Sequence, residues 1–251
     1  MSEYTIPNLK NACRIIFHIS ECVRPLSAAE LSKSLAIPRT SAIRILETLK
    51  EQNFLKEDGR KYSLGPAIAE ISKRTNVNSS SIADLSAAFL KRLTEISGET
   101  SHVGIFSNGK ILILKVCDSP KPLHAASRAG VLADIHCSAT GKAILAHLSQ
   151  SSPELLKRVK LTKRTSATID TAEKLKKNLK TVLDKGYALD DEEYHDHVRC
   201  LAAPIFDKNG KIAAAIGITA PSVRFAKSDA PKIGAIVRNI AEEFTARLAD
   251  A

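Results

Sequence analysis

The sequence predicts an α+β protein with two domains, and three observations support that prediction. At 251 residues, the chain is too long for one small domain. Near the N-terminus, three helical patterns are followed by a short, charged hairpin pattern. Further along, two Asn-Gly dipeptides, at residues 108–109 and 209–210, each separate two strand-like runs, as in antiparallel hairpins. Helices that flank an antiparallel sheet are typical of α+β domains.

The first helix is expected over roughly residues 8–21. Four apolar residues recur there at helical spacing: Leu9, Ala12, Ile16 and Ile19. A second helix begins after Ser27, because Glu30 three positions later completes a capping box. Pro38 suits the first turn of a third helix, which runs to about Gln52. The core residues expected in this third helix are Ala42, Ile43, Leu46 and Leu49.

The stretch after the third helix predicts a hairpin. Two short strands, at residues 54–55 and 62–64, flank a turn at Asp58-Gly59. The order helix, helix, turn, helix, hairpin is that of a winged helix-turn-helix, and we assign it to residues 1–67.

Residues 68–81 are expected to form a linker helix and a polar linker, and residues 82–251 the second domain. This domain is expected to begin with a helix at 82–96, a hairpin around Asn108-Gly109 and an extended segment at 122–127. A helix follows the small residues of 138–145, and a basic helix capped by Asp170 covers 170–185. A hairpin around Asn209-Gly210 and a helix at 228–248 complete the domain.

The first turn of the third helix carries candidate DNA contacts. In a helix-turn-helix, the second helix of the pair enters the major groove with its N-terminal residues. Arg can bind guanine through two hydrogen bonds, and Thr or Ser can reach a phosphate or a thymine methyl group. We therefore expect DNA contacts from Arg39, Thr40, Ser41 and Arg44, and backbone contacts from Lys56, Arg60 and Lys61 of the hairpin. A solvated polar helix face and a domain used only for protein contacts stay open as alternatives.

The charge balance favours a polyanionic partner without locating it. The chain carries a formal charge of +10; residues 1–75 hold twelve Lys/Arg against eight Asp/Glu (+4), and the rest hold 25 against 19 (+6). An aromatic share of 4% with no Trp argues against reading single strands by base stacking.

The composition also bears on the cellular location. No apolar run approaches the ~20 residues that span a bilayer, and the first residues lack a signal-peptide pattern. The five scattered cysteines suit reduced thiols in a cytoplasm. We therefore expect a cytoplasmic protein without a membrane partner.

The segment "SATGKAIL" (138–145) is similar to the end of a nucleotide-binding P-loop, but it does not complete the motif. His136 stands where the first Gly is needed, and Ala143 follows Lys142, so nucleotide hydrolysis is not expected. The small residues Ala139, Thr140 and Gly141 can still bring backbone N–H groups close to an anion at the positive end of a helix. Tight packing of small residues under a sheet is the alternative.

Two other segments could converge on that turn. Asp190 and Cys200 lie at the ends of an acidic, His-containing loop. In the strand "AAAIGIT", Ala215, Gly217 and Thr219 share one face, which leaves room for a small ligand and one hydrogen bond to it.

Catalysis and metal binding are the rival interpretations of these residues. Cys200 beside His195 and His197 could be a nucleophile with a base, in an enzyme that also uses Asp190 and whose N-terminal domain only mediates assembly. A Cys within an apolar strand is usually an inert small hydrophobe, however. A metal site could combine His136, Cys137, His195, His197 and Cys200, but their spacings match no zinc signature. We expect no metal, no cofactor and no enzymatic activity.

Several segments together carry a family resemblance: "LSAAELSKSLAIPRTSAIRILETLKEQNFL" followed by "YSLG", then "SGET", "HCSATGKAILA", "LTKRTSATI", "KGYALDDEE" and "RCLAAPIFDKNGKIAAAIGITAP". In this order and spacing the chain resembles the IclR family of bacterial transcription regulators over essentially its whole length. The resemblance implies an N-terminal winged helix-turn-helix, a linker helix and a C-terminal effector domain with a GAF/PAS-like sheet. It also implies a homodimer or tetramer on a roughly palindromic operator, controlled by a small organic acid or related metabolite.

The resemblance further implies effector-binding positions. They fall on Ala139, Thr140 and Gly141 in the anion-cradling turn, Asp190 and Cys200 in the polar part, Gly217 and Thr219 on the inner strands, and Leu123 and Ala125 on the apolar side. Members often carry Ser at the strand positions, so Gly217 is expected to widen the pocket and Thr219 to keep a hydroxyl. The family usually has a Gly in the x-G-x-RC segment, where this chain has His197.

The sequence as a whole therefore predicts a DNA-binding transcription regulator. It is expected to repress a catabolic operon and to respond to a carboxylate or related metabolite. A pure protein-interaction module, which would show no salt-dependent binding to DNA, is the remaining interpretation.

Overall fold

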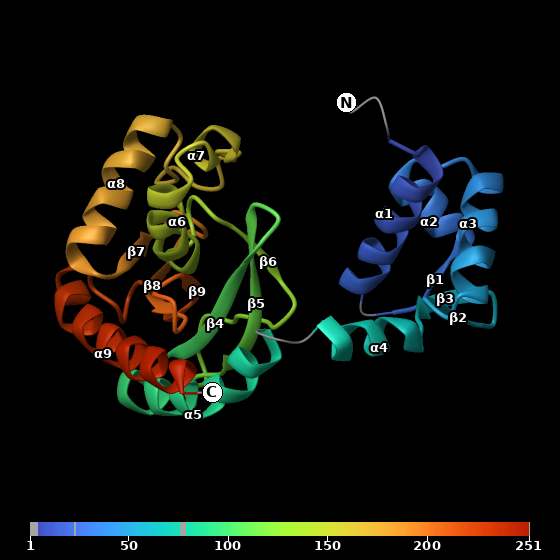
Figure 1. Cartoon of the computed structure of the whole chain (residues 1–251). Coiled ribbons are helices and arrows are strands. Elements are labelled where there is room, and N and C mark those ends of the chain that lie inside the picture. The colour runs from blue at the N-terminus through green and yellow to red at the C-terminus, as the bar shows by residue number, and fades with distance from the viewer. Residues whose placement is uncertain (1–4, 23, 76–78, 251) are drawn as a thin grey trace. The chain divides into compact units, whose positions relative to one another are not determined.

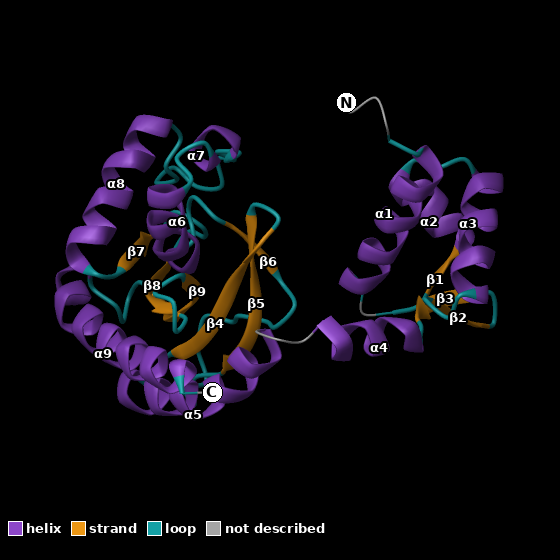
Figure 2. Ribbon diagram, viewed as in Figure 1, coloured by secondary structure: helices purple, strands orange, loops and turns teal. Residues whose placement is uncertain are grey.

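The computed structural model describes residues 5–22, 24–75 and 79–250, and the chain divides into two compact units between residues 77 and 78 (Figure 1). The first unit is mainly helical with a small sheet, and the second combines a large sheet with helices (Figure 2). This confirms the predicted α+β class. Within the described residues, no helix is both long and apolar enough to cross a membrane.

The first unit is a winged helix-turn-helix, as predicted. Its elements are α1 (Pro7–Glu21), β1 (Leu26–Ser27), α2 (Ala28–Leu35), α3 (Arg39–Glu51), β2 (Leu55–Asp58), β3 (Lys61–Leu64) and α4 (Pro66–Thr75). The capping box is present: Glu30 N donates to the Ser27 hydroxyl, and Ser27 N donates to the Glu30 carboxylate. The sequence did not predict β1, which pairs with β3 so that the sheet order is β1-β3-β2.

The core of this unit differs from the expected set at two positions. Leu9 of α1 is 61% exposed, and Ile43 of α3 is 41% exposed. The buried residues of α3 are Ala42, Ile45, Leu46 and Leu49. Their spacing of three, one and three residues places them on a single face, and Ile43 lies to one side of it.

The hairpin turn lies one residue later than predicted. Asp58 still pairs with Lys61, so the turn residues are Gly59 and Arg60. Both have left-handed backbones, with φ of 56° and 62°. Two consecutive positive φ angles match the right-handed twist of the strands in a two-residue hairpin.

The second unit is built around one antiparallel sheet of six strands in the order β6-β5-β4-β9-β8-β7. The strands are β4 (Thr100–Ser107), β5 (Lys110–Cys117), β6 (Leu132–Asp134), β7 (Ala188–Asp191), β8 (Val198–Phe206) and β9 (Ile212–Pro221). The helices are α5 (Ser79–Ser97), α6 (Ala139–Ser151), α7 (Leu155–Arg158), α8 (Ala172–Lys185), the short 3₁₀ helix η1 (Lys227–Asp229) and α9 (Ala230–Ala249).

The helices cover both faces of this sheet (Figure 2). On one face, α5 and α9 pack against Ile216 and Ile218 of β9. On the opposite face of the sheet, α6 and α8 pack in the hydrophobic cluster that contains Ala215 of β9. The alternation expected for β9 is therefore present, because successive side chains point to opposite faces.

Three local expectations for this unit need correction. Residues 122–127 form no strand; the third strand is β6, ten residues later. Helix α5 begins at Ser79. The N-cap of α8 is Thr171, whose hydroxyl accepts from Lys174 N, while Asp170 binds the Lys174 side chain. The predicted hairpin around Asn209-Gly210 is present between β8 and β9, and in its turn the Asp207 carboxylate accepts from the N–H groups of Asn209 and Lys211.

Candidate functional site

The first turn of α3 presents a free basic surface. Arg39, Thr40 and Arg44 are exposed, and Ser41 is half-buried. Among the described residues, neither Arg39 nor Arg44 takes part in an ion pair or a side-chain hydrogen bond. Their guanidinium groups are therefore available to an external partner.

The hairpin beside α3 adds exposed cations. Lys56, Arg60 and Lys61 all lie on its solvent side. The acidic Glu47 and Glu57 are both held by Lys50, at 2.5 and 2.9 Å. This pairing offsets one of the two negative charges that would otherwise oppose a polyanion near the hairpin.

The second unit contains a cavity of about 310 Å³, which we call the effector cavity. It lies where the N-terminus of α6, strands β4, β8 and β9 and the loop 125–131 meet. Its polar lining residues are His102, Ser127, Arg128, Ser138, Thr140, Asp190, Tyr194, His195, Cys200 and Thr219. Apolar residues, among them Ile113, Ala125 and Val198, complete the wall.

The N-terminus of α6 opens into the effector cavity. Ser138 is the N-cap, and its hydroxyl accepts from Gly141 N at 3.2 Å. Ala139 and Thr140 provide the first two N–H groups of the helix and both line the cavity. Such N–H groups, together with the helix dipole, favour an anion.

The imidazole of His102 lies between the hydroxyl groups of two threonines that line the effector cavity. Its Nε2 lies 2.8 Å from the Thr140 hydroxyl, and its Nδ1 lies 3.3 Å from the Thr219 hydroxyl. Burial lowers the pKa of His102 to about 4, so the ring is neutral at physiological pH. A neutral imidazole has one donor and one acceptor, so it donates one of these hydrogen bonds and accepts the other.

Asp190 and Cys200 lie next to this group. The Asp190 carboxylate accepts from Glu193 N at 2.8 Å and from Tyr194 N at 3.2 Å. Burial raises the pKa of Asp190 to about 7, although the positive charge of Lys142 opposes the shift. Burial and the nearby Asp190 charge raise the pKa of the Cys200 thiol well above its usual value. Cys200 is therefore a protonated thiol, which is a poor nucleophile.

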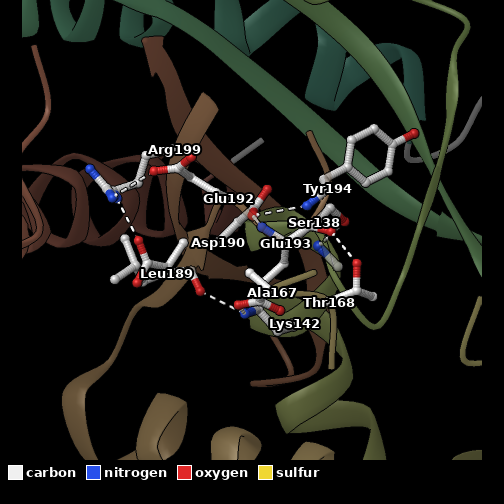
Figure 3. Close-up of polar contacts among 12 residues, drawn as sticks. Ser138, Lys142, Ala167, Thr168, Leu189, Asp190, Glu192, Glu193, Tyr194 and Arg199 are labelled. Atoms are coloured by element: carbon white, nitrogen blue, oxygen red, sulfur yellow. Dashed lines mark hydrogen bonds and ion pairs between the residues drawn. The ribbon is translucent and has the colours of Figure 1, made fainter. Parts of the chain in front are cut away.

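Lys142 crosses the layer between α6 and β7 (Figure 3). Its side chain has no exposed surface, and its amino group binds the Leu189 carbonyl oxygen at 2.6 Å and the Glu193 carboxylate. The hydroxyls of Thr165 and Thr168 each donate to a backbone oxygen of the 192–193 turn at 2.7 Å. This fixes the turn that follows Asp190.

Six of the nine predicted effector positions line the effector cavity: Ala125, Ala139, Thr140, Asp190, Cys200 and Thr219. Leu123 lies outside it and is 69% exposed. Gly141 packs on the backbone, since an added Cβ would lie 2.4 Å from the Ile135 carbonyl oxygen. Gly217 does not widen the cavity; a Cβ there would lie 2.3 Å from the Leu201 carbonyl oxygen, so Gly permits the close approach of β8 and β9.

Lining residues that the sequence analysis did not assign to the effector include His102, Arg128 and Tyr194, and also His195, which it considered only as a base or a metal ligand. His102 lies two residues after the "SGET" segment (97–100) that carried part of the resemblance, which was the only available signal. Arg128 is exposed and supplies a cation at the cavity.

The candidate metal ligands have different surroundings and form no common site. His136 Nε2 lies 3.1 Å from the Thr162 carbonyl oxygen, Cys137 is fully buried, and the side chain of His197 is 91% exposed. In the part of the chain that the structure describes, no three His, Cys, Asp or Glu side chains are grouped so that they could hold a metal.

Two family models match the chain. The one described as "Bacterial transcriptional regulator IclR C-terminal" matches residues 74–246, and the "IclR helix-turn-helix domain" matches residues 9–59. The regulator KdgR of Escherichia coli K12 is 30% identical over 230 residues, covering 90% of this chain and 86% of KdgR. The repressor IclR of the same strain is 29% identical over 245 residues, covering 96% of this chain and 89% of that protein.

Solved structures with the same fold cover both units. The Thermotoga maritima IclR structure has a TM-score of 0.70 at 26% identity, covering 96% of this chain and 98% of that one. An IclR homologue from Microbacterium hydrocarbonoxydans, complexed with 4-hydroxybenzoate, has a TM-score of 0.81 at 18% identity, covering 97% of this chain and 100% of the other.

Proposed function

Because the chain belongs to the IclR family of bacterial transcriptional regulators and is a DNA-binding regulator rather than an enzyme, we propose that a small carboxylate in the effector cavity controls its affinity for DNA. We further propose that it represses a catabolic operon in the cytoplasm, as a homodimer or tetramer on a roughly palindromic operator. A dimer with two-fold symmetry would read two half-sites, which is why symmetry is expected in the operator.

The free cations of α3 are the observation that supports the proposed DNA contacts. Arg44 is exposed and lies just after Arg39 and Thr40 in α3, and its guanidinium group has no partner among the described residues. This suits a residue that reads base edges, while Lys56, Arg60 and Lys61 suit phosphate contacts.

Arg44→Ala tests this assignment. We expect specific binding to weaken by about 1–3 kcal/mol while the fold is unchanged, measured by fluorescence anisotropy on the DNA upstream of the gene. Lys91→Ala removes the same charge from an exposed site on α5 and serves as the matched control. Equal weakening by both variants would show a general charge effect and would exclude α3 as the reader.

The geometry of the effector cavity supports a carboxylate. In this proposal an anion lies against Arg128 and the first N–H groups of α6, and the hydroxyls of Thr140 and Thr219 and the Asp190 carboxyl bind the other polar groups of the ligand. A volume of about 310 Å³ suits a small organic acid. The aromatic carboxylate in the M. hydrocarbonoxydans homologue is of this chemical class.

Thr219→Val tests the effector cavity. Valine keeps the shape but removes the hydroxyl that lies 3.4 Å from the Cys200 sulfur and 3.3 Å from His102 Nδ1. Operator binding should persist, and release by members of a panel of keto acids, semialdehydes and aromatic acids should be lost. An unaltered response to the panel would refute the assignment of this cavity.

A further inference from the structure

A second cavity of about 400 Å³ lies at the edge of the sheet formed by β7, and we call it the edge cavity. The loop 167–169, α8, β7 and the start of α9 form its walls. It shares no lining residue with the effector cavity. The function proposed above makes no use of it.

Two buried hydrogen-bond acceptors line the edge cavity and have no partner among the described residues. They are Glu193 Oε2 and Asn178 Oδ1. The Glu193 side chain is only 7% exposed, and its other oxygen is taken by Lys142. A buried acceptor without a donor is unfavourable, so a ligand that brings N–H donors is stabilised by pairing with these two atoms.

The cations at this cavity are not equivalent. Lys227 is held by Asp191 at 2.7 Å, and Asp191 is also bound by Arg199. Lys185 is exposed, and no ion pair or hydrogen bond occupies its amino group within the described chain. One cation is thus available to a ligand, whereas the other is neutralised.

The lining therefore offers two acceptors and one free cation. An amine without a carboxylate would meet the uncompensated charge of Lys185, and a carboxylate without an amine would leave both acceptors unpaired. The other wall residues include Ile169, Val182 and Pro231, which are apolar. These features together select a molecule with an ammonium group, a carboxylate and a small apolar part.

We propose that the edge cavity binds a small, neutral α-amino acid as its zwitterion. The ammonium group donates to Glu193 Oε2 and Asn178 Oδ1, and the carboxylate pairs with the Lys185 amino group. The chain thereby has a second ligand site, separate from the effector cavity.

Isothermal titration calorimetry of the full chain with L-alanine tests this site. We expect saturable binding of L-alanine at millimolar concentration, and none of propionate or ethylamine, which each lack one of the two charged groups. Lys185→Gln should weaken L-alanine binding by at least about tenfold, which is about 1.4 kcal/mol. Asn178→Leu should weaken it as well while leaving the circular dichroism spectrum and thermal unfolding as in the wild type.

Lys176→Gln is the matched control, because Lys176 is an exposed lysine of the same helix that lies outside the edge cavity. Its affinity for L-alanine should equal that of the wild type. No heat with L-alanine, glycine or L-valine would overturn the proposal, as would propionate binding as tightly as L-alanine. Equal loss in the Lys176→Gln and Lys185→Gln variants would also overturn it, since it would show that surface charge alone attracts the ligand.

Discussion

Replacing His197 by glycine should stabilise the second unit. His197 has a left-handed backbone with φ of 63°, just before β8. Its N–H donates to the Glu192 carboxylate at 2.8 Å, and its carbonyl oxygen accepts from Ser222 N at 2.8 Å. Glycine retains both hydrogen bonds, because they are made by the backbone. The left-handed requirement also explains the Gly that the family usually has at this point.

The expected gain follows from two opposing terms. A left-handed backbone costs a residue with a Cβ roughly 1–2 kcal/mol, and glycine loses roughly 0.5–1 kcal/mol more backbone entropy on folding. The imidazole contributes little, since the side chain is 91% exposed and lies 3.9 Å from Glu192. His197→Gly should therefore raise the free energy of unfolding by up to about 1.5 kcal/mol, or the midpoint by up to about 6 °C.

Thermal and urea unfolding followed by circular dichroism measure this change. His197→Ala removes the ring but keeps the Cβ, so it should give no gain. Asn108→Gly is a second control, because Asn108 has φ of 47° and asparagine tolerates this region. If His197→Gly were less stable than the wild type, or if His197→Ala gained as much as glycine, the argument from backbone strain would be refuted.

Three further predictions concern capping, pH and thiol reactivity. Ser27→Ala should lower the stability of the first unit by about 1 kcal/mol in urea unfolding, whereas Ser34→Ala, at an exposed position of the same helix, should not. Burial raises the pKa of Asp190 from 3.8 to about 7, so its contribution to stability is complete below pH 4 and is lost as the pH rises through 7. Asp190→Asn should remove that decline, and denaturation midpoints from pH 4 to 8 that fall as in the wild type would contradict it. At pH 8, iodoacetamide should modify the exposed Cys13 and leave Cys200 unmodified, as peptide mass spectrometry would show.

The parts of the fold that depend on local sequence could be predicted. The capping box of Ser27 and Glu30 and the Asn108-Gly109 turn each involve residues within four positions, and the structure contains both. The burial of Ile43 was predicted wrongly because neighbouring apolar residues fit two overlapping helical faces. The prediction of an extended segment at 122–127 was also wrong. Part of this segment lines the effector cavity and pairs with no strand, so nothing requires a regular backbone there.

The candidate site could be predicted only in part, because its contacts are distant in sequence. His102 lies 38 positions from Thr140 and 117 from Thr219, and no periodic pattern joins such residues. The partners of Lys142 lie 47 and 51 positions away, so the sequence showed an incomplete P-loop but not a buried ion pair. The family resemblance located cavity-lining positions correctly where a side chain points into the cavity. It did not at Gly141 and Gly217, where the backbone packs closely.

At the hairpin tip of the first unit, the residue type that would give the most stable turn differs from the residue type that carries a positive charge. Arg60 occupies a left-handed position, where glycine or asparagine would fold at lower energy. Neither of those residues carries a positive charge, so the more stable turn would be the less basic one. Selection for heat resistance alone should therefore tend to replace Arg60, and selection for affinity for DNA should restore it. The residue found at this one position in thermophilic members of the family would show which requirement dominates there.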